Sequence, residues 1–296
     1  MSQEQPSYQE KEELFNRFVV GEYLKYGSVD EIFRQNKYEL PISYPGVHRL
    51  IKRWGIIKSA GPNSILSEGI TFLSLLSKNK VPLESLYKRL PPSFKTSMGT
   101  MHRLLHNIKE GVTRRVGTAL VITSDNNPDE VLVGEDVSTP RLELGKPFGS
   151  ITLPMGYSKM DEDSRDSILR VLQQEVFTQM AIDRNLPLNL IPANHKPFMY
   201  VDVADIRVSV YHIELPQQLT YNNCFSSHKV RKHNFISVSE LAGDNRIANF
   251  RSGIKEIGLG YRKYLEKSVE GVYIKPIVEK CLLNRELAIA FAQELA

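Results

Sequence analysis

The feature that most constrains the fold of this chain is a change in the spacing of its apolar residues near residue 113. Up to that point apolar side chains recur every three or four residues, as in amphipathic helices, whereas later segments alternate as β-strands do. A chain of 296 residues is also long enough for two compact units, each with its own core. We therefore expect an α+β protein with one domain over residues 1–112 and a second over residues 113–296.

The first domain begins with three predicted helices. Residues 11–27 form an amphipathic helix that Gly27 can end, and Ser28 can cap a short helix in "SVDEIFRQNK". The third helix, in "YPGVHRLIKRWGI", is apolar on one face and basic on the other. Three short helices of which the last is basic are typical of a helix-turn-helix unit, whose final helix enters the DNA major groove. The candidate DNA-contacting residues here are His48, Arg49, Lys52 and Arg53.

A second set of three helices is expected after the linker "KSAGPNS". Ser67 can cap the first, Pro82 suits the first turn of the second, and the third ends at Gly111. Its candidate DNA-contacting residues are Thr100, Arg103, His106 and Asn107. The alternative is that both sets belong to an ordinary helical bundle, which binds protein or carries its cations only as a solvated surface.

Charge distinguishes the two domains. Residues 1–115 contain 18 Lys and Arg against 11 Asp and Glu, whereas the remaining residues contain 20 against 23. This excess favours an anionic partner, double-stranded DNA, for the first domain. The apolar runs are shorter than the roughly 20 residues of a membrane span, so we expect a cytoplasmic protein without a membrane partner. Cys224 and Cys281 have no metal-site spacing and indicate neither a disulfide framework nor a structural metal.

The second domain is predicted to be an α/β sandwich followed by C-terminal helices. A helix is expected over residues 164–180, and further helices from about Leu259 onward. Strands before and after a single central helix imply a layered α/β arrangement. The expected strands lie in "RRVGTALVIT", "EVLVGED", "GSITLPMG", "KPFMYVDVA" and "IRVSVYHIEL", and "HNFISVSELAGD" is expected to be a strand that runs into a short turn.

The stretch from Gly149 to Phe177 resembles the Nudix box, in which a glycine is followed after five residues by a glutamate and, after seven more, by the sequence REUxEExGU, with U aliphatic. Pro154 and Gly156 match the loop of the motif. Its first glutamate, arginine, aliphatic residue and last glutamate are matched by Glu162, Arg170, Leu172 and Glu175. The resemblance covers about residues 114–243 and implies a Nudix-like domain.

The departures from this motif bear on activity. The family's box glutamates hold magnesium, a cation that takes oxygen ligands and neutralises the pyrophosphate being cleaved. The corresponding positions are Val171, Gln174 and Glu175, and Phe177 replaces the terminal glycine. Because two negative charges are missing, we expect no catalytic residues, no metal site and no cofactor. Magnesium would be required only if the chain were a divergent hydrolase.

Charged residues around the box allow two interpretations. The acidic loop of residues 161–166 either rebuilds a metal site or caps the following helix, where negative charge is favourable. The basic segment 226–234, with His228 and His233, either meets phosphates or is a solvated loop. Glu162 and Arg170 are also expected to form an ion pair that shapes the loop. The candidate ligand-binding residues are Arg114, Arg115, Arg141, Glu162, Arg170 and Glu175.

These observations favour a DNA-binding transcriptional regulator with an inactive Nudix-like domain that senses a nucleotide-type ligand or mediates assembly. The plan is similar in concept to Nudix-related transcriptional regulators, which place the sensor before the DNA-binding part, whereas the order here is reversed. A homodimer is expected because such proteins often pair half-sites. The alternatives are a divergent Nudix hydrolase acting on a nucleoside diphosphate derivative, and an interaction scaffold.

Overall fold

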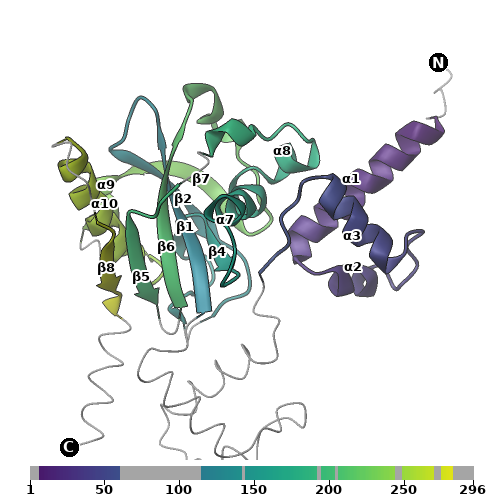
Figure 1. Ribbon diagram of the computed structural model, residues 1–296, viewed down its shortest axis with the longest axis horizontal. Helices are drawn as coiled ribbons and strands as arrows, with labels where there is room; N and C mark the ends of the chain where they lie inside the picture. Colours follow the sequence, from purple (N-terminus) through teal and green to yellow (C-terminus); the bar gives the residue numbers. More distant parts are fainter. Residues whose placement is uncertain are drawn as a thin grey trace, which may run out of the picture.

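The computed structural model of the protein describes residues 7–60, 115–141, 144–191, 195–203, 206–243, 249–269 and 275–282. Figure 1 shows an N-terminal helical unit beside a larger domain in which helices flank β-sheets. The predicted class is therefore confirmed, because the fold is α+β overall with a helical region followed by an α/β sandwich. The predicted boundary at residues 112 and 113, and the whole second set of predicted helices, lie outside the described residues.

The helical unit contains the three helices expected at the start of the chain. They are α1 (Tyr8–Tyr26), α2 (Val29–Gln35) and α3 (Tyr44–Arg53). Each begins at a serine whose hydroxyl accepts a backbone N–H of the first turn, which satisfies a donor that has no partner within the helix. Gly27 ends α1 in the left-handed conformation (φ 70°), and its N–H donates to the carbonyl of Tyr23 at 2.7 Å.

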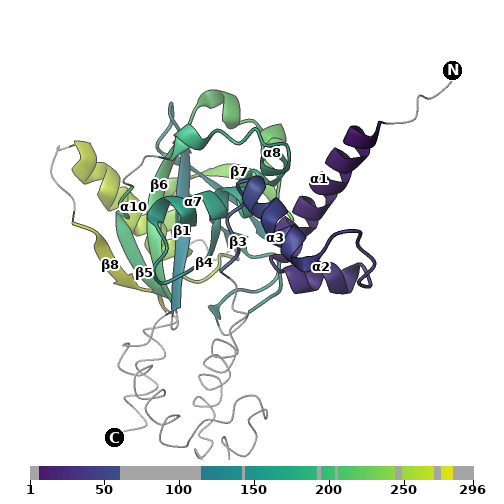
Figure 2. The same cartoon turned by 45° about the vertical axis from the view of Figure 1, so that its right-hand side comes forward.

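The helical unit packs against the sandwich, on the side that carries α7 (Ser164–Val171) and α8 (Thr178–Ile182) (Figures 1 and 2). Its core includes Ala181 of α8 as well as residues of all three N-terminal helices. Trp54, 6% exposed, donates its indole N–H to the carbonyl of Ile182 at 3.0 Å, and the Arg184 guanidinium lies 3.3 Å from the centroid of its ring. The two units therefore share apolar surface, which is the main source of their association.

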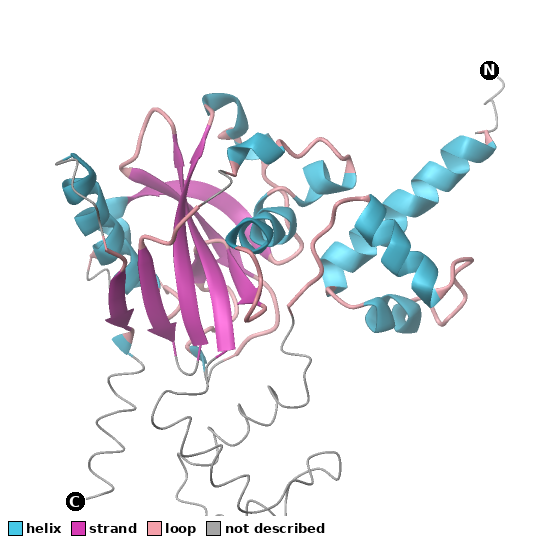
Figure 3. Ribbon diagram, viewed as in Figure 1, coloured by secondary structure: helices cyan, strands magenta, loops and turns pink. Residues whose placement is uncertain are grey.

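The sandwich contains two sheets. The strands are β1 (Arg115–Ser124), β2 (Glu130–Asp136), β3 (Ile151–Thr152), β4 (Met155–Ser158), β5 (Met199–Val203), β6 (Ile206–Leu215), β7 (Val230–Ser237) and β8 (Ile277–Lys280). The larger sheet has the order β4-β1-β6-β5-β8, with β1 parallel to β6 and β5 parallel to β8, and the smaller has the order β3-β2-β7. Figure 3 shows the strands between α9 (Val238–Ala242) and α10 (Ile254–Val269) on one side and α7 and α8 on the other.

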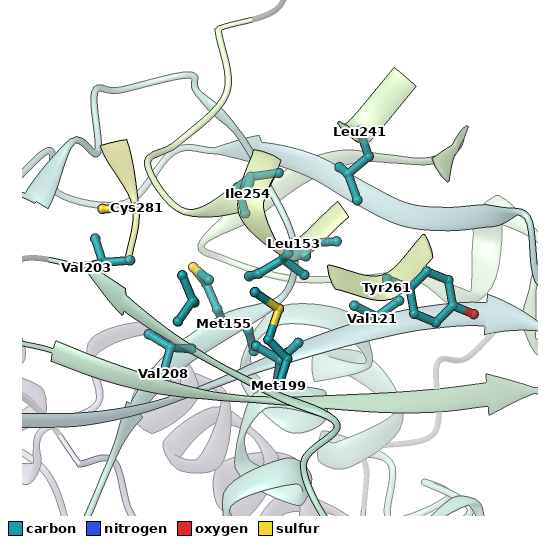
Figure 4. Packing of buried hydrophobic residues seen from close by; sticks show 14 of the residues in the cluster. Val121, Leu153, Met155, Met199, Val203, Val208, Leu241, Ile254, Tyr261 and Cys281 are labelled. Atoms are coloured by element: carbon teal, nitrogen blue, oxygen red, sulfur yellow. The ribbon is translucent and has the colours of Figure 1, made fainter. Parts of the chain in front are cut away.

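Alternation along β1 divides the buried residues between two cores. Ala119 and Val121 face the first core, and Leu120 and Ile122 face the second, as expected for a strand that is covered on both sides. The first core, shown in Figure 4, lies between the sheets and α9 (Val238–Ala242) and α10 (Ile254–Val269). We call residues 164–176, which comprise α7 and the helical turn that follows it, the box helix. The second core lies under the box helix and packs it against β1.

The helix predicted over residues 164–180 is interrupted. The chain forms α7 and then a π-helical turn, Leu172–Val176, before α8 begins. The N–H of Phe177 donates to the carbonyl of Leu172, five residues earlier, at 2.7 Å. The apolar spacing indicated the helix but gave no sign of this wider turn, which depends on partners elsewhere in the chain.

Other differences from the predicted elements are local. The strand expected in "GSITLPMG" is broken between β3 and β4 at Leu153 and Pro154, and the two pieces join different sheets. Helix α10 begins at Ile254, earlier than predicted, and is followed by the unpredicted strand β8. No helix of the described residues is long and apolar enough to cross a membrane.

Candidate functional site

A pocket of about 470 Å³ lies where the helical unit meets the sandwich. The helical unit contributes the C-terminal end of α1 at residues 25–27 and the segment at residues 59–60. The sandwich contributes the box helix, parts of β1, β4 and β6, and the segments that follow β2 and precede β7. This volume is within the range of small-molecule sites in proteins.

Cationic side chains outnumber carboxylates in this pocket. The two carboxylates that line it are Asp136 and Glu175. Apolar side chains of Met155, Ile206 and Val208 form part of its wall. The lining cations are Lys25, Arg141, Lys146, Arg170, Lys229 and Arg251.

Asp136, at the end of β2, lies between two cations. Its carboxylate is 6% exposed and lies 3.2 Å from Lys146 Nζ and 3.5 Å from a guanidinium nitrogen of Arg251. It also accepts the backbone N–H of Ser138 at 3.0 Å and the Ser138 hydroxyl at 2.7 Å. Burial lowers the pKa of Lys146 although Asp136 opposes this shift, and burial likewise lowers the pKa of Arg251. The oxygens of Asp136 are thus occupied by donors of the protein itself.

Glu175 is the remaining carboxylate of the box helix. It is 8% exposed and accepts the backbone N–H of Met155 at 3.1 Å. Desolvation raises its pKa, whereas the positive charges of Lys229 and Lys146 oppose the shift. Desolvation also lowers the pKa of Lys229, whose main attractive partners are Glu175 and Asp136. The ammonium of Lys229 donates to Gln174 Oε1 at 2.6 Å and thereby lies beside the box helix.

The two glutamines of the box helix hold the segment that leaves the helical unit. Gln173, 3% exposed, donates to the carbonyl of Gly55 at 2.8 Å and accepts the N–H of Ile57 at 3.0 Å. Gln174 donates to the Ser59 hydroxyl at 2.9 Å. The side chain of Gln174 therefore joins Lys229 to residue 59.

The π-helical turn is stabilised by the segment that precedes and begins β7. The carbonyl of Gln174 accepts the Ser227 hydroxyl at 2.8 Å, and the carbonyl of Val176 accepts the N–H of Ser226 at 2.8 Å. His233 Nε2 is 2.8 Å from the carbonyl of Glu175. These contacts use carbonyls that the wider turn leaves without a regular α-helical partner, and π-turns are frequent at functional sites.

Glu162 and Arg170 form the predicted ion pair, with both side chains almost fully buried. Hydrogen bonds from Arg170 and Ser167 lower the pKa of Glu162 and outweigh its desolvation, which alone would raise it. Arg170 also donates to the carbonyl of Lys58 at 3.3 Å. In the adjacent acidic loop, Asp163 caps α7 by accepting the N–H of Arg165, in agreement with the capping interpretation of these acidic residues.

The residues present do not fit a magnesium site. Val171 offers no ligand, Gln174 is bonded on both sides, and Asp136 and Glu175 have cations beside them. A divalent cation would have to enter among Lys146, Lys229 and Arg251, against electrostatic repulsion. In the described part of the chain, no group of three or more His, Cys, Asp or Glu side chains is arranged to hold a metal ion.

The structure brings together only some of the predicted ligand-binding residues. Arg141, Arg170 and Glu175 line the pocket, whereas Glu162 lies behind Arg170. Arg115 is at the start of β1, where its guanidinium is 3.3 Å from the Tyr157 hydroxyl and outside the pocket lining. Arg114 lies outside the described residues.

Sequence reasoning did not single out the pocket cations Lys146, Lys229 and Arg251, although Lys229 belongs to the basic segment 226–234. They are 22 or more residues apart in sequence, and no periodic spacing connects them. The interpretation of residues 226–234 as a solvated loop is wrong, because Lys229 lines the pocket and Val230–Ser237 form strand β7.

The predicted DNA-contacting residues of the first helical set lie on α3. Arg49, Lys52 and Arg53 are exposed, and none of them lines the pocket. His48 is half-buried beside the ring of Tyr44, and burial lowers its pKa. A contact between His48 and DNA stays a prediction. Thr100, Arg103, His106 and Asn107 lie outside the described residues.

Comparison with known proteins gave similar solved structures but no family assignment. No protein-family model and no curated protein sequence matches the chain. The chain is similar to a Nudix hydrolase from Nitrosomonas europaea, with 13% identity over 57% of this chain and 80% of that one and a TM-score of 0.36. It is also similar to a C. elegans Ap4A hydrolase, with 16% identity over 53% and 99% and a TM-score of 0.35.

A third similar structure is an ADP-ribose pyrophosphatase from Streptococcus suis, with 13% identity over 56% of this chain and 99% of that one and a TM-score of 0.35. Each of these likenesses concerns the fold alone. The molecule is an α+β protein in which N-terminal helices precede an α/β sandwich, and the two parts meet at a cation-rich pocket.

Proposed function

We propose that this protein is a DNA-binding transcriptional regulator whose Nudix-like domain senses a nucleotide-type ligand without hydrolysing it. The proposal rests on the observation that both parts of the chain line the pocket. Lys25 and Ser59 belong to the helical unit and its outgoing segment, whereas Arg141 and Lys229 belong to the Nudix-like domain. A ligand in this pocket would touch both parts of the chain.

Contact with both parts is a physical route to regulation. A ligand changes DNA affinity only if it binds the DNA-competent and DNA-incompetent arrangements unequally. Any movement of the helical unit relative to the box helix would alter the pocket wall at residues 25–27 and 59–60. Ligand affinity would therefore depend on the position of the helical unit, and by reciprocity ligand binding would bias that position.

The exposed basic side of α3 supports DNA binding by the helical unit. Arg49, Lys52 and Arg53 are exposed together on a ten-residue helix, and such cations contribute salt-dependent attraction to phosphates. Apolar residues Val47, Leu50 and Ile51 fix the opposite side of α3 in the core of the unit. The homodimer expected from paired half-sites stays a prediction.

The test begins with genome-wide DNA capture by the native protein, followed by fluorescence anisotropy on a captured duplex. Replacement of Arg49, Lys52 and Arg53 by glutamine should weaken binding and reduce the slope of log affinity against log salt by up to about 3, since each phosphate contact contributes about 0.9. The matched control replaces Arg262, Lys263 and Lys267, which are exposed on α10. Equal effects of the two triple variants would contradict the proposal.

The sensing part is tested with the same duplex and a panel of nucleotides and nucleoside diphosphate derivatives. At least one member should shift DNA affinity in the wild type and leave that affinity unchanged in a Lys229→Met variant. Magnesium-dependent turnover of a pyrophosphate library, abolished by Glu175→Gln, would instead establish the divergent hydrolase. Failure of both DNA binding and turnover would leave an interaction scaffold.

A further inference from the structure

We infer that the pocket binds a phosphoryl or diphosphoryl group directly through Lys146, Lys229 and Arg251, with these side chains in place of a divalent cation. The inference rests on the proposed ligand-sensing function and specifies the group that the pocket recognises. It follows from the way in which the carboxylates and cations of the pocket are paired.

The carboxylates are already neutralised by the protein. Asp136 has Lys146 Nζ at 3.2 Å, Arg251 at 3.5 Å and two donors from Ser138. Glu175 is buried, bonded to the N–H of Met155 and attracted to Lys229. Carboxylates in this state have little capacity to attract a metal ion, because each already faces a positive charge.

The cations, in contrast, are incompletely neutralised. Three of them, Lys146, Lys229 and Arg251, share the two carboxylates Asp136 and Glu175, which leaves an excess of one positive charge when all five groups are ionised. Burial lowers the pKa of all three cations, so their charged forms are disfavoured relative to water. An anionic group that accepts their hydrogen bonds would remove this penalty.

The shape of the pocket suits a ligand with one charged end. Val203, Ile206 and Val208 line it together with the cations and supply an apolar surface. Its volume of about 470 Å³ exceeds what a phosphoryl group alone would fill, so room remains for a less polar part of the ligand. Binding of the charged end is thereby separable from binding of the rest, and inorganic pyrophosphate can serve as a probe for it.

The experiment is calorimetric titration of the full-length protein with inorganic pyrophosphate, in EDTA and in excess magnesium. We expect binding in EDTA that magnesium does not strengthen. Binding that requires magnesium would overturn the inference, and so would the absence of binding in EDTA. This comparison uses the wild-type protein and does not depend on how any variant folds.

Variants identify the residues that bind the probe. Lys229→Met and Lys146→Met should each weaken pyrophosphate binding in EDTA by about tenfold or more, because each removes a charge-assisted donor. Lys229→Arg keeps the charge and should retain most of the affinity. Lys232→Met is the matched control, since Lys232 lies on β7 with a side chain 76% exposed and pairs with Glu135. Wild-type affinity in both methionine variants, or an equal loss in the Lys232 control, would overturn the assignment.

The outcomes separate this inference from the proposed regulator function. If pyrophosphate binds in EDTA through these lysines but no nucleotide alters DNA affinity, the site is established and the regulator function fails. If nucleotides alter DNA affinity only in the presence of magnesium, the regulator function stands and the metal-free site fails.

Discussion

The cations of α3 and those of the pocket have the same chemistry in opposite surroundings. Arg49, Lys52 and Arg53 are exposed, whereas the side chains of Lys146 and Arg251 are 13% and 17% exposed and face a buried carboxylate. Exposed charges are screened by salt and contribute little to folding. Buried charges are held in one geometry, and the loss of one partner leaves the other unpaired in a medium of low dielectric. The first kind suits attraction to a polyanion, and the second suits selection of one ligand.

The largest expected effect comes from breaking a buried ion pair. Arg170→Met should lower the free energy of unfolding by about 3–5 kcal/mol, because Glu162 would remain buried without its cation. Arg34→Met is the exposed control, since Arg34 is 69% exposed and pairs with Glu31 within α2; it should cost less than about 1 kcal/mol. Urea denaturation of both variants measures the difference. Equal decreases in the free energy of unfolding would show that burial does not determine how much these ion pairs stabilise the protein.

A second prediction concerns a buried histidine, His212, whose charged form is disfavoured in the folded protein. Desolvation, with a smaller contribution from His195, lowers the pKa of His212 from 6.5 to about 4. Its Nε2 lies 2.9 Å from the Thr123 hydroxyl and 3.0 Å from the Tyr261 hydroxyl, which suits the neutral ring. Between these two pKa values the unfolded chain binds a proton that the folded protein does not. Stability is therefore retained above pH 6.5 and is lost as the pH falls towards 4.

The loss attributable to His212 should reach about 3 kcal/mol, at roughly 1.4 kcal/mol per pKa unit. It is measured as the change in unfolding free energy between neutral and acidic pH in the wild type, minus the same change in His212→Gln. An identical pH dependence in the two proteins would contradict it. The equivalent experiment on His48→Gln serves as a comparison within the helical unit, where burial also lowers the pKa of the histidine.

The smallest expected effect concerns the hydrogen bonds between the two units. Gln173→Ala removes two bonds to the backbone at Gly55 and Ile57 and should lower the free energy of unfolding by about 2 kcal/mol. The control is Gln179→Ala, whose exposed side-chain amide donates to Asp183 within the same domain. Denaturant titration compares the two. If Gln179→Ala lowers the free energy of unfolding as much as Gln173→Ala does, the hydrogen bonds of Gln173 to the helical unit stabilise the protein no more than an exposed hydrogen bond.

Most of the fold could be predicted from local patterns. Alternation placed β2 and β6 at the residues they occupy, and the serine before α2 marked the start of that helix. The π-turn could not be predicted, because its carbonyl partners Ser226 and Ser227 lie about 50 residues away. Strand β8 was missed because a four-residue edge strand carries little periodic signal.

The site was predicted only in part. The box resemblance drew attention to Arg170, Val171, Gln174 and Glu175, which all line the pocket. It could not indicate that lysines take positions beside the carboxylates, because Lys146 and Lys229 come from segments outside the motif. Motifs record side chains close in sequence, whereas electrostatic pairing is decided by proximity in space.

The bonds that Gln173 makes to the outgoing segment also determine which sequence changes this junction tolerates. Its amide contacts a carbonyl oxygen at Gly55 and an N–H at Ile57, and Arg170 contacts the carbonyl oxygen of Lys58. All three contacts are with main-chain atoms and do not depend on the side chains at these positions, whereas the bond from Gln174 to the Ser59 hydroxyl does. Exchange of the side chain at Lys58 therefore leaves this attachment in place, whereas a proline at position 57, which has no N–H, releases one end of it.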